Sequence, residues 1–254
     1  MEVEMVREAL IESAINATLR GSYWRVSVFQ SLTSTQSELI GKENLHHGEV
    51  FVTEFQSAGR GRVNRTFEAT ESSALLFSLY LEPKRNKMEW SAIPLLAGLS
   101  LVNALSNLDE KLETNLKWPN DLLIGERKVA GILAEARPDG VIVGIGLNVE
   151  MVKSELPVPT ATSLKLENFA ELNRNVILSE ILTNLALTIE LWESGSNIGF
   201  EQYRQVSSTL GKEVEVHLPS GEIISSRATG ITDVGELQLA NGARVNVGDV
   251  IHLR

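Results

Sequence analysis

The stretch LKWPNDLLIGERKVAGILAEA, residues 116–136, decides the fold class of this sequence. Its two apolar runs are separated by Gly125-Glu126-Arg127, which is typical of a β-hairpin with a polar tip. A third apolar run, VIVGIGLNV at residues 141–149, has the length and composition of a strand that can pair with this hairpin. The sequence therefore predicts a sheet with antiparallel neighbours in this region.

Outward from the hairpin, further strands and helices alternate irregularly, which favours an α/β fold with a mixed sheet flanked by helices. Strands are expected at 24–30, 50–55 and 72–82, and helices at 3–19, 34–45, 88–112, 175–193 and 199–210. After Gly211 the apolar period changes to two, and PSGE at 219–222 predicts a turn. We therefore expect a large domain at 1–206, and a small antiparallel barrel of SH3 type at 207–254.

The composition excludes several function classes. The 254 residues are 43% hydrophobic and 22% charged, which is typical of a globular protein. With 23 basic and 33 acidic residues the net charge is −10, so no global field attracts nucleic acid or an anionic membrane, and phosphate binding must be local. There is no cysteine, and the four histidines show no metal-binding spacing, so no protein-held metal is expected.

Two features of the sequence predict a cytoplasmic protein. The amino terminus, MEVEMVREAL, lacks the cationic start and apolar core of an export signal. The longest nearly apolar run, residues 93–105, is about half as long as a membrane span.

The segment EFQSAGRGRVNR, residues 54–65, follows an apolar strand and is rich in arginine and glycine. Glycine lets the backbone approach a ligand closely, and guanidinium groups bind carboxylate and phosphate oxygens in pairs. A strand that ends in such a loop can wrap an anion. The residues leave open a solvated basic loop with no ligand, or one that contacts nucleic acid.

Polar residues also interrupt the hairpin at Trp118-Pro119-Asn120-Asp121. Lys117, Asp121 and Lys128 can line one surface across the hairpin, combining a carboxylate with two ammonium groups. The alternative is a Pro-Asn-Asp turn with ion pairing.

Gly144, Gly146 and Asn148 lie in the strand GIGLNV. A dinucleotide-binding fingerprint requires a third glycine and a following helix, which this segment lacks, so we exclude a Rossmann site. The glycines permit close backbone approach, either to a ligand or to a neighbouring helix. Asn148 can offer its amide to the edge of a ligand.

The segment SLTSTQ, residues 31–36, has two interpretations. Ser34 or Thr35 can cap the helix that begins there. Two hydroxyl groups followed by the Gln36 amide can also bind an uncharged polar group such as a urea, which has one carbonyl acceptor and two N–H donors.

Taken together, SLTSTQ, EFQSAGRGRVNR, KWPNDLLIGERKVAGILAEA and GIGLNV occur in an order and spacing that resemble the biotin-protein ligases, over about residues 28–254. The resemblance implies a class II synthetase-like mixed sheet flanked by helices, followed by a small C-terminal SH3-like β-barrel. Repressor members of the family carry an additional winged helix-turn-helix at the amino terminus. Fewer than thirty-five residues precede SLTSTQ here, so the form without that module is expected.

The resemblance also implies a two-step ATP-dependent reaction, with Mg²⁺ accompanying ATP. Biotin and ATP give biotinyl-5'-AMP and pyrophosphate, and a lysine of a biotin carboxyl carrier domain of acetyl-CoA carboxylase or a related carboxylase then attacks the acyl carbon. No direct nucleic-acid or membrane partner is expected. Monomer and ligand-dependent homodimer both remain open, and the edge strands of the sheet are candidates for pairing with the carrier or a second copy.

The same resemblance assigns roles to individual residues. For binding of biotin it implies Ser34, Thr35, Gln36, Gln56, Gly131, Gly144 and Gly146. For binding of the adenylate and nucleotide it implies Arg60, Gly61, Arg62, Arg65, Lys128, Asn148 and Arg254. Lys128 corresponds to the lysine that contacts the carboxylate and the bridging oxygen, and Lys117 and Asp121 lie where the carrier lysine arrives. The expected catalytic residues are Arg60, Lys117, Asp121 and Lys128.

The arginine loop departs from the family pattern GRGRxGRxW. This chain has Asn64 in place of the third glycine of that pattern, and Phe67 in place of its tryptophan. Asn64 tolerates left-handed geometry better than most residues, so the turn can persist. Phe67 keeps an aromatic face at the ligand but loses the indole N–H.

The sequence disfavours three alternative functions. A lipoate or octanoate transferase of the acyltransferase kind needs a cysteine, and this chain has none. A lipoate-protein ligase is expected to lack the hydroxyl-rich segment and the GRGR loop. The acidic balance and the short segment before SLTSTQ disfavour a nonenzymatic nucleic-acid binder or biotin-responsive regulator.

Overall fold

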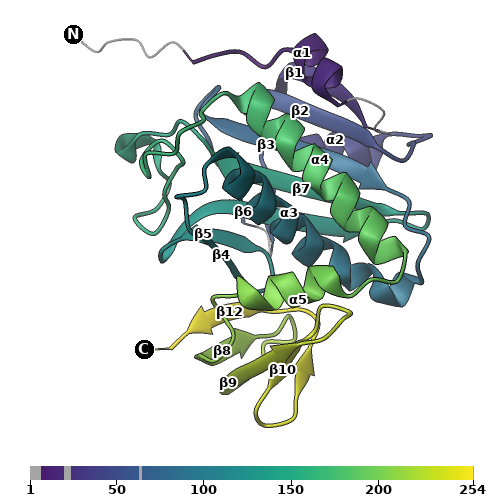
Figure 1. Ribbon diagram of the computed structural model, residues 1–254, viewed down its shortest axis with the longest axis vertical. Coiled ribbons are helices and arrows are strands. Elements are labelled where there is room, and N and C mark those ends of the chain that lie inside the picture. Colours follow the sequence, from purple (N-terminus) through teal and green to yellow (C-terminus); the bar gives the residue numbers. More distant parts are fainter. Residues whose placement is uncertain (1–6, 20–23, 63–64, 254) are drawn as a thin grey trace.

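The computed structural model describes residues 7–19, 24–62 and 65–253. Its main element is a seven-stranded sheet in the order β1-β2-β3-β7-β6-β5-β4, in which β1 and β2 are parallel and the other neighbours antiparallel (Figure 1). The strands are β1 Arg25–Leu32, β2 Glu49–Gln56, β3 Ala74–Leu81, β4 Thr114–Lys117, β5 Asp121–Ile124, β6 Arg127–Ala136 and β7 Val141–Asn148. The expected mixed sheet is therefore confirmed.

Helices cover both faces of this sheet. They are α1 Glu12–Thr18, α2 Thr35–Gly41, α3 Ile93–Leu108, α4 Arg174–Glu193 and α5 Ile198–Gln205, with short 3₁₀ turns at η1 Lys87–Ala92 and η2 Lys153–Glu155. The long helices α3 and α4 pack together on one face, and α2 packs against β2, β3 and β7 (Figure 1). Every residue of β3 and β7 is buried, as expected for central strands between two layers.

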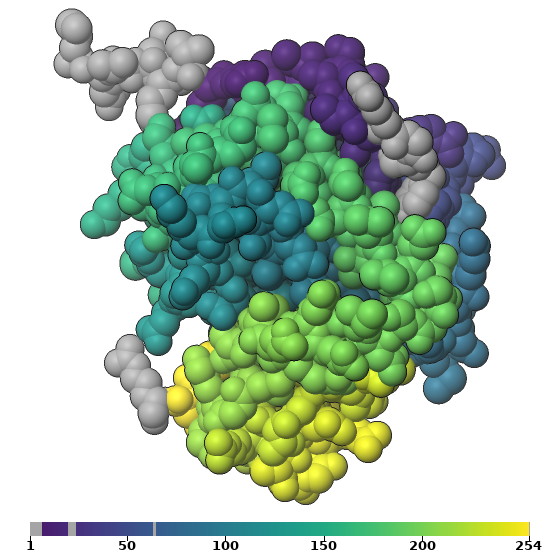
Figure 2. Space-filling model, viewed as in Figure 1, coloured from purple at the N-terminus to yellow at the C-terminus, as the bar shows by residue number. Residues whose placement is uncertain are grey.

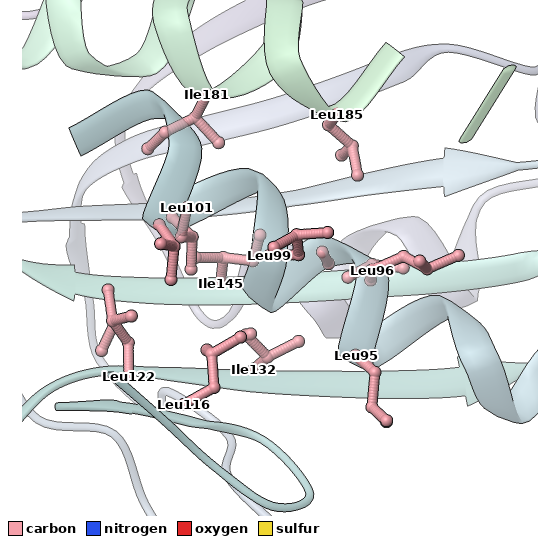
Figure 3. Close-up of a cluster of buried hydrophobic side chains, with 14 of the residues drawn as sticks. Leu95, Leu96, Leu99, Leu101, Leu116, Leu122, Ile132, Ile145, Ile181 and Leu185 are labelled. Carbon is pink, nitrogen blue, oxygen red and sulfur yellow. The ribbon is translucent and has the colours of Figure 1, made fainter. Parts of the chain in front are cut away.

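The main core lies between the sheet and the two long helices. Figure 3 shows Leu99 of α3 and Ile181 of α4 gathered with Ile132 and Ile145 of the sheet. The segment Lys87–Leu108 is long and apolar enough to cross a membrane, but 67% of its most apolar window is buried in the protein. It is a core helix of a globular domain.

A second, five-stranded antiparallel sheet follows α5, in the order β11-β10-β9-β8-β12. Its strands are β8 Glu213–His217, β9 Ile223–Ile231, β10 Leu237–Leu239, β11 Arg244–Val245 and β12 Asp249–His252. It forms the yellow lobe beneath α5 in Figure 2. Among the described residues β11 and β12 are its open edges, so the expected closed barrel is not seen.

The segment around Trp118 holds the two sheets together. The Trp118 indole donates to the Gly235 carbonyl at 3.0 Å, and its backbone N–H donates to Thr209 Oγ1 at 3.0 Å. Trp118-Pro119-Asn120 is a turn with a cis peptide before the proline, so the predicted hairpin of residues 116–136 contains three strands. The turn interpretation of this segment is confirmed.

Four predicted helices are shorter than expected. The helix predicted at 34–45 ends at Gly41, and the one predicted at 199–210 ends at Gln205. In the described part of the helix predicted at 3–19, the helix begins only at Glu12. The helix predicted at 88–112 is α-helical from Ile93 to Leu108, after the 3₁₀ turn η1. Pro94 lacks a backbone N–H, which is tolerated in the first turn of a helix, so the α-helix begins next to it.

Both edges of the seven-stranded sheet have partners within the chain. At β1 the Asn16 amide donates to the Val26 carbonyl at 3.0 Å and accepts from its N–H at 3.3 Å. At β4 the Leu116 N–H donates to the Val206 carbonyl at 2.8 Å, and the Ser208 N–H donates to the Leu116 carbonyl at 2.9 Å. The edge groups at Val26 and Leu116 are therefore already engaged, and pairing of the remaining edge groups with a carrier or a second copy stays a prediction.

Candidate active site

A trough crosses the sheet where neighbouring strands lack side chains. Gly131 of β6 lies opposite Gly146 of β7, and Gly144 lies two residues away on the same face. A Cβ at Gly146 would be 2.6 Å from the Phe67 ring, and one at Gly144 would be 2.6 Å from Gln36 Oε1. Glycine is required at both positions because side chains of the cavity wall lie directly against the backbone.

This trough is part of a cavity of about 340 Å³ between the two sheets. All but two of the predicted site residues line it: Ser34, Thr35, Gln36, Gln56, Arg60, Gly61, Arg62, Arg65, Phe67, Lys117, Asp121, Lys128, Gly131, Gly144 and Gly146. The structure therefore brings together residues from four separate sequence segments.

One end of the cavity is a hydrogen-bonded group of hydroxyls and amides. The Thr35 N–H and hydroxyl both donate to Gln56 Oε1, at 2.7 and 3.2 Å, and the Thr35 hydroxyl lies 2.8 Å from that of Ser78. Ser34 also caps α2, accepting from the Ser37 N–H at 3.5 Å. The capping interpretation of SLTSTQ is confirmed, and the same residues line the cavity, where binding of a urea group stays a prediction.

Gln36 presents an unpaired acceptor at this end. Its Nε2 donates to Glu135 Oε2 at 2.9 Å and to the Ile142 carbonyl at 3.3 Å. Its Oε1 is buried and has no hydrogen-bond partner among the described residues. A buried unpaired acceptor costs about 1–3 kcal/mol. A ligand N–H donor at this position would remove that cost.

The arginine loop also lines the cavity. Arg60 makes a bidentate pair with Glu135, with distances of 3.0 and 2.9 Å. Arg62 donates to the Gly248 carbonyl at 3.1 Å and to Asn120 Oδ1 at 3.4 Å, and Arg65 pairs with Asp249. Burial lowers the pKa of Arg62, and Asp249 and Asp121 oppose that shift. The loop thus carries three guanidinium groups, each engaged by the protein.

Asp121 lies between two ammonium groups at the floor of the cavity. It is opposite Lys117 in the β4–β5 register, and its Oδ1 is 2.6 Å from Lys128 Nζ. A bulge shifts the β5–β6 register here, which places Lys128 Nζ only 3.1 Å from where a Gly131 Cβ would be. The predicted surface of Lys117, Asp121 and Lys128 is therefore present.

Lys117 is half-buried among charged groups. Burial lowers the pKa of Lys117 below its usual value, and the nearby Lys128 acts in the same direction. Asp121 and Asp249 raise the pKa and oppose these effects.

Two predicted site residues are not placed at the cavity. Asn148 is buried and donates through Nδ2 to the Thr162 carbonyl at 2.9 Å, because the chain after residue 160 folds back on β7. It is not a lining residue of the cavity. Arg254 lies outside the described residues, as does Asn64 of the arginine loop.

The sequence did not identify Glu135 and Asp249, although both hold loop arginines. Glu135 is on the same face of β6 as Gly131, four residues away, and this alternation was a usable signal. Asp249 is 184 residues from Arg65 and has no local signal, since only the packing of the second sheet brings it there.

Among residues 7–19, 24–62 and 65–253, no three acidic or histidine side chains form a group that could hold a metal ion. The two carboxylates that line the cavity, Asp121 and Asp249, each contact a cationic side chain.

Known proteins match the chain along nearly its whole length. The profile of the Biotin/lipoate A/B protein ligase family matches residues 26–151, and that of the Biotin protein ligase C terminal domain matches residues 209–253. A biotin--[acetyl-CoA-carboxylase] ligase from Mycobacterium tuberculosis is 36% identical over 244 residues, which cover 92% of this chain and 91% of that protein.

Two further proteins are similar. The bifunctional ligase/repressor BirA of Bacillus spizizenii is 32% identical over 163 residues, which cover 61% of this chain and 50% of that protein. The structure of a biotin protein ligase from Aquifex aeolicus in complex with biotin and ATP is 29% identical, with a TM-score of 0.77, and the match covers 90% of this chain and 98% of that one.

Proposed function

This chain belongs to the biotin protein ligase family, and on that premise we propose that it is an ATP-dependent biotin--[acetyl-CoA-carboxylase] ligase. It joins biotin to ATP as biotinyl-5'-AMP, and then transfers biotin to a lysine of a carrier domain. The similar Aquifex aeolicus protein has been solved with biotin and ATP, which are the two small substrates that this reaction needs.

The observation that carries this proposal is the unpaired Gln36 Oε1 at one end of a glycine-floored trough. A urea group has two N–H donors and one carbonyl acceptor, and the Gln36 acceptor and the hydroxyls of Ser34 and Thr35 can satisfy both kinds of group. A fused bicyclic urea has little thickness and fits a trough whose floor lacks side chains. We therefore place the biotin ring system in this trough, beside the Gln36 amide and the Phe67 ring that lie against Gly144 and Gly146.

The first step brings the biotin carboxylate close to the phosphates of ATP, so cations are needed around these anionic groups. The carboxylate oxygen of biotin attacks the α-phosphorus of ATP, the bond from that phosphorus to the bridging oxygen breaks, and pyrophosphate leaves. Lys128 projects from β6 over Gly131, where it can contact both the carboxylate and the new bridging oxygen. Arg60, Arg62 and Arg65 supply guanidinium groups for the phosphates. Fixed cations of this kind stabilise charge that develops during the reaction.

The second step needs a neutral amine. The carrier lysine attacks the acyl carbon of the mixed anhydride, an amide forms, AMP leaves, and the amine gives up its protons. A free lysine has a pKa near 10.4, so about 4–5 kcal/mol separate it from its neutral form at pH 7. We place the incoming amine beside Lys117, which disfavours a second positive charge, and Asp121, which accepts a proton.

Four further assignments accompany this function. Magnesium enters with ATP and is held by phosphates and water, since the described residues do not gather three acidic or histidine ligands for it. Residues 207–254 act as the small SH3-like companion domain, and the protein works in the cytoplasm. The protein partner is a biotin carboxyl carrier domain.

Mass spectrometry of an apo carrier domain tests the function directly. After incubation with this protein, ATP, Mg²⁺ and biotin, we expect the mass of one biotinyl group on a single lysine, and none when ATP is omitted. A carrier that keeps its mass in the complete mixture contradicts the proposal. An equal adduct with lipoate in place of biotin would contradict the assigned substrate.

A further inference from the structure

The second sheet contributes one carboxylate to the cavity, that of Asp249 on β12. Among the described lining residues from this sheet, only Asp249 carries a formal negative charge, and the others are His217, Val250 and Ile251. Asp249 is close to the arginine loop because β12 pairs with β8 at the edge that faces the seven-stranded sheet.

Asp249 binds two loop guanidinium groups at once. Arg65 Nη2 donates to its Oδ2, and Arg62 Nη2 lies 3.9 Å from its Oδ1. The neighbouring Gly248 carbonyl accepts from Arg62 at 3.1 Å. The side chain of Arg62 is only 19% exposed, and an unpaired cation there would be costly.

A carboxylate in this position has the chemistry of a phosphate oxygen. Both are anionic, and both accept the paired N–H groups of guanidinium. A ligand phosphate would draw on the same two guanidinium groups as Asp249, and two anions side by side would repel each other.

We propose that Asp249 is a positioning residue that stands in for a ligand phosphate. It holds Arg62 and Arg65 at the cavity rim from the second sheet, and a phosphate group takes these guanidinium groups from it. The identity of that phosphate as part of ATP rests on the proposed function. The competition between two anions rests only on the contacts above.

Glu135 does not have the same role. It pairs with Arg60, but it also accepts from Gln36, so it belongs to the hydrogen-bonded end of the cavity. Among the described residues, the side chain of Asp249 makes hydrogen bonds and ion pairs only with loop arginines.

The test is calorimetric titration of inorganic pyrophosphate into the protein without biotin, so that no chemistry occurs. Asp249→Asn keeps the size and an acceptor oxygen of the side chain but removes its charge. We expect it to bind pyrophosphate about two- to fivefold more tightly than the parent, the range for an ion pair that is partly exposed, as Arg65 and Asp249 are. If Asp249 only supported the fold, its replacement would weaken the binding of pyrophosphate.

Two variants make this measurement specific. Asp233→Asn removes a carboxylate of the same sheet that pairs with Arg204 away from the cavity, and it should leave pyrophosphate binding unchanged. In an Arg65→Gln background the gain from Asp249→Asn should be smaller, because one of the two competing guanidinium groups is absent. Asp249→Ser provides a second charge-removing variant should the asparagine protein fold poorly.

Equal, weaker or undetectable binding by the charge-removed variants overturns the proposal. The proposal is also overturned if Asp249→Asn tightens pyrophosphate binding as much in the Arg65→Gln background as in the parent. A carrier domain that acquires no biotin would contradict the proposed function and leave this comparison of pyrophosphate affinities intact. In the active enzyme we expect Asp249→Asn to lower the KM for ATP rather than raise kcat.

Discussion

At the level of single residues, Asp121 is the carboxylate that lies next to two lysines of the cavity. It contacts Lys128 at 2.6 Å and lies opposite Lys117 in the sheet. If Asp121 accepts the proton of the carrier lysine, Asp121→Asn should slow transfer from preformed biotinyl-5'-AMP by about 100-fold or more, the usual contribution of a general base. Single-turnover transfer to the apo carrier measures this step without adenylate formation.

The control for Asp121 is Asp139→Asn. Asp139 is 65% exposed and pairs with Arg137 at 3.7 Å, away from the cavity. It should transfer biotin at the rate of the parent. An Asp121→Asn protein with the parent's rate would show that another group accepts the proton.

Gly146 shows how a missing side chain shapes the site. A Cβ there would meet the Phe67 ring at 2.6 Å, so Gly146→Ala must displace the ring that borders the trough. We expect the KM for biotin to rise about tenfold, which corresponds to roughly 1.4 kcal/mol, within the usual cost of overpacking. Initial rates at varied biotin and saturating ATP measure it.

The matched control is Gly41→Ala, in which the added Cβ would have nothing within 4 Å. The KM for biotin should not change in that variant. A Gly146→Ala enzyme with an unchanged KM for biotin would mean that the ligand does not lie in the trough.

At the level of elements, β12 is held against the segment before β8 partly through a neutral histidine. His252 Nε2 lies 3.2 Å from Thr209 Oγ1, and its Nδ1 is 3.3 Å from Lys212 Nζ. Burial, assisted by Lys212 and Lys117, lowers the pKa of His252 to about 4. The folded protein therefore keeps this ring neutral at pH values where the unfolded chain binds a proton.

The sign of the pH dependence follows from that shift. The contribution of His252 is fully present above its unfolded pKa of about 6.5, and it is lost as the pH falls toward about 4. Between about pH 7 and pH 4.5, Tm should fall less in His252→Gln than in the parent. The exposed His46→Gln serves as control and should follow the parent; equal Tm losses in all three proteins would contradict the assignment.

At the level of the whole molecule, one buried ion pair joins three parts of the chain. Arg174 at the start of α4 pairs with Glu54 of β2 at 2.6 Å, with side chains that are 0% and 4% exposed. Arg174 also donates to the Glu8 carbonyl, and Glu54 accepts from the Leu10 N–H, each at 2.6 Å. The pair fixes the amino-terminal segment against the sheet and the helix.

Arg174→Met should leave Glu54 buried without its partner. We expect the free energy of unfolding to fall by about 3–5 kcal/mol, and the double variant Arg174→Met with Glu54→Gln to recover part of that loss. Urea denaturation followed by circular dichroism measures both. Arg204→Gln, which breaks the more exposed pair with Asp233, should cost at most about 1 kcal/mol, and a similar cost at Arg174 would contradict this account.

The sequence by itself determined the elements and the chemistry available to them. Apolar periodicity and turn residues are local properties, so the strands and the long helix α4 could be predicted within a few residues of their bounds. The types of site residue were also readable, because glycines, arginines and hydroxyls have the same chemistry wherever the chain places them. Their gathering in one cavity followed from the family resemblance.

Only the tertiary structure decided which groups meet. Asp249 reaches Arg65 across 184 residues, Glu135 takes Arg60, and the amide of Asn148 binds Thr162 instead of lining the cavity. The same holds for the edge of β4, which pairs with residues near 207. Such contacts depend on how separate segments pack, and no local pattern records which distant acceptor a polar side chain will find.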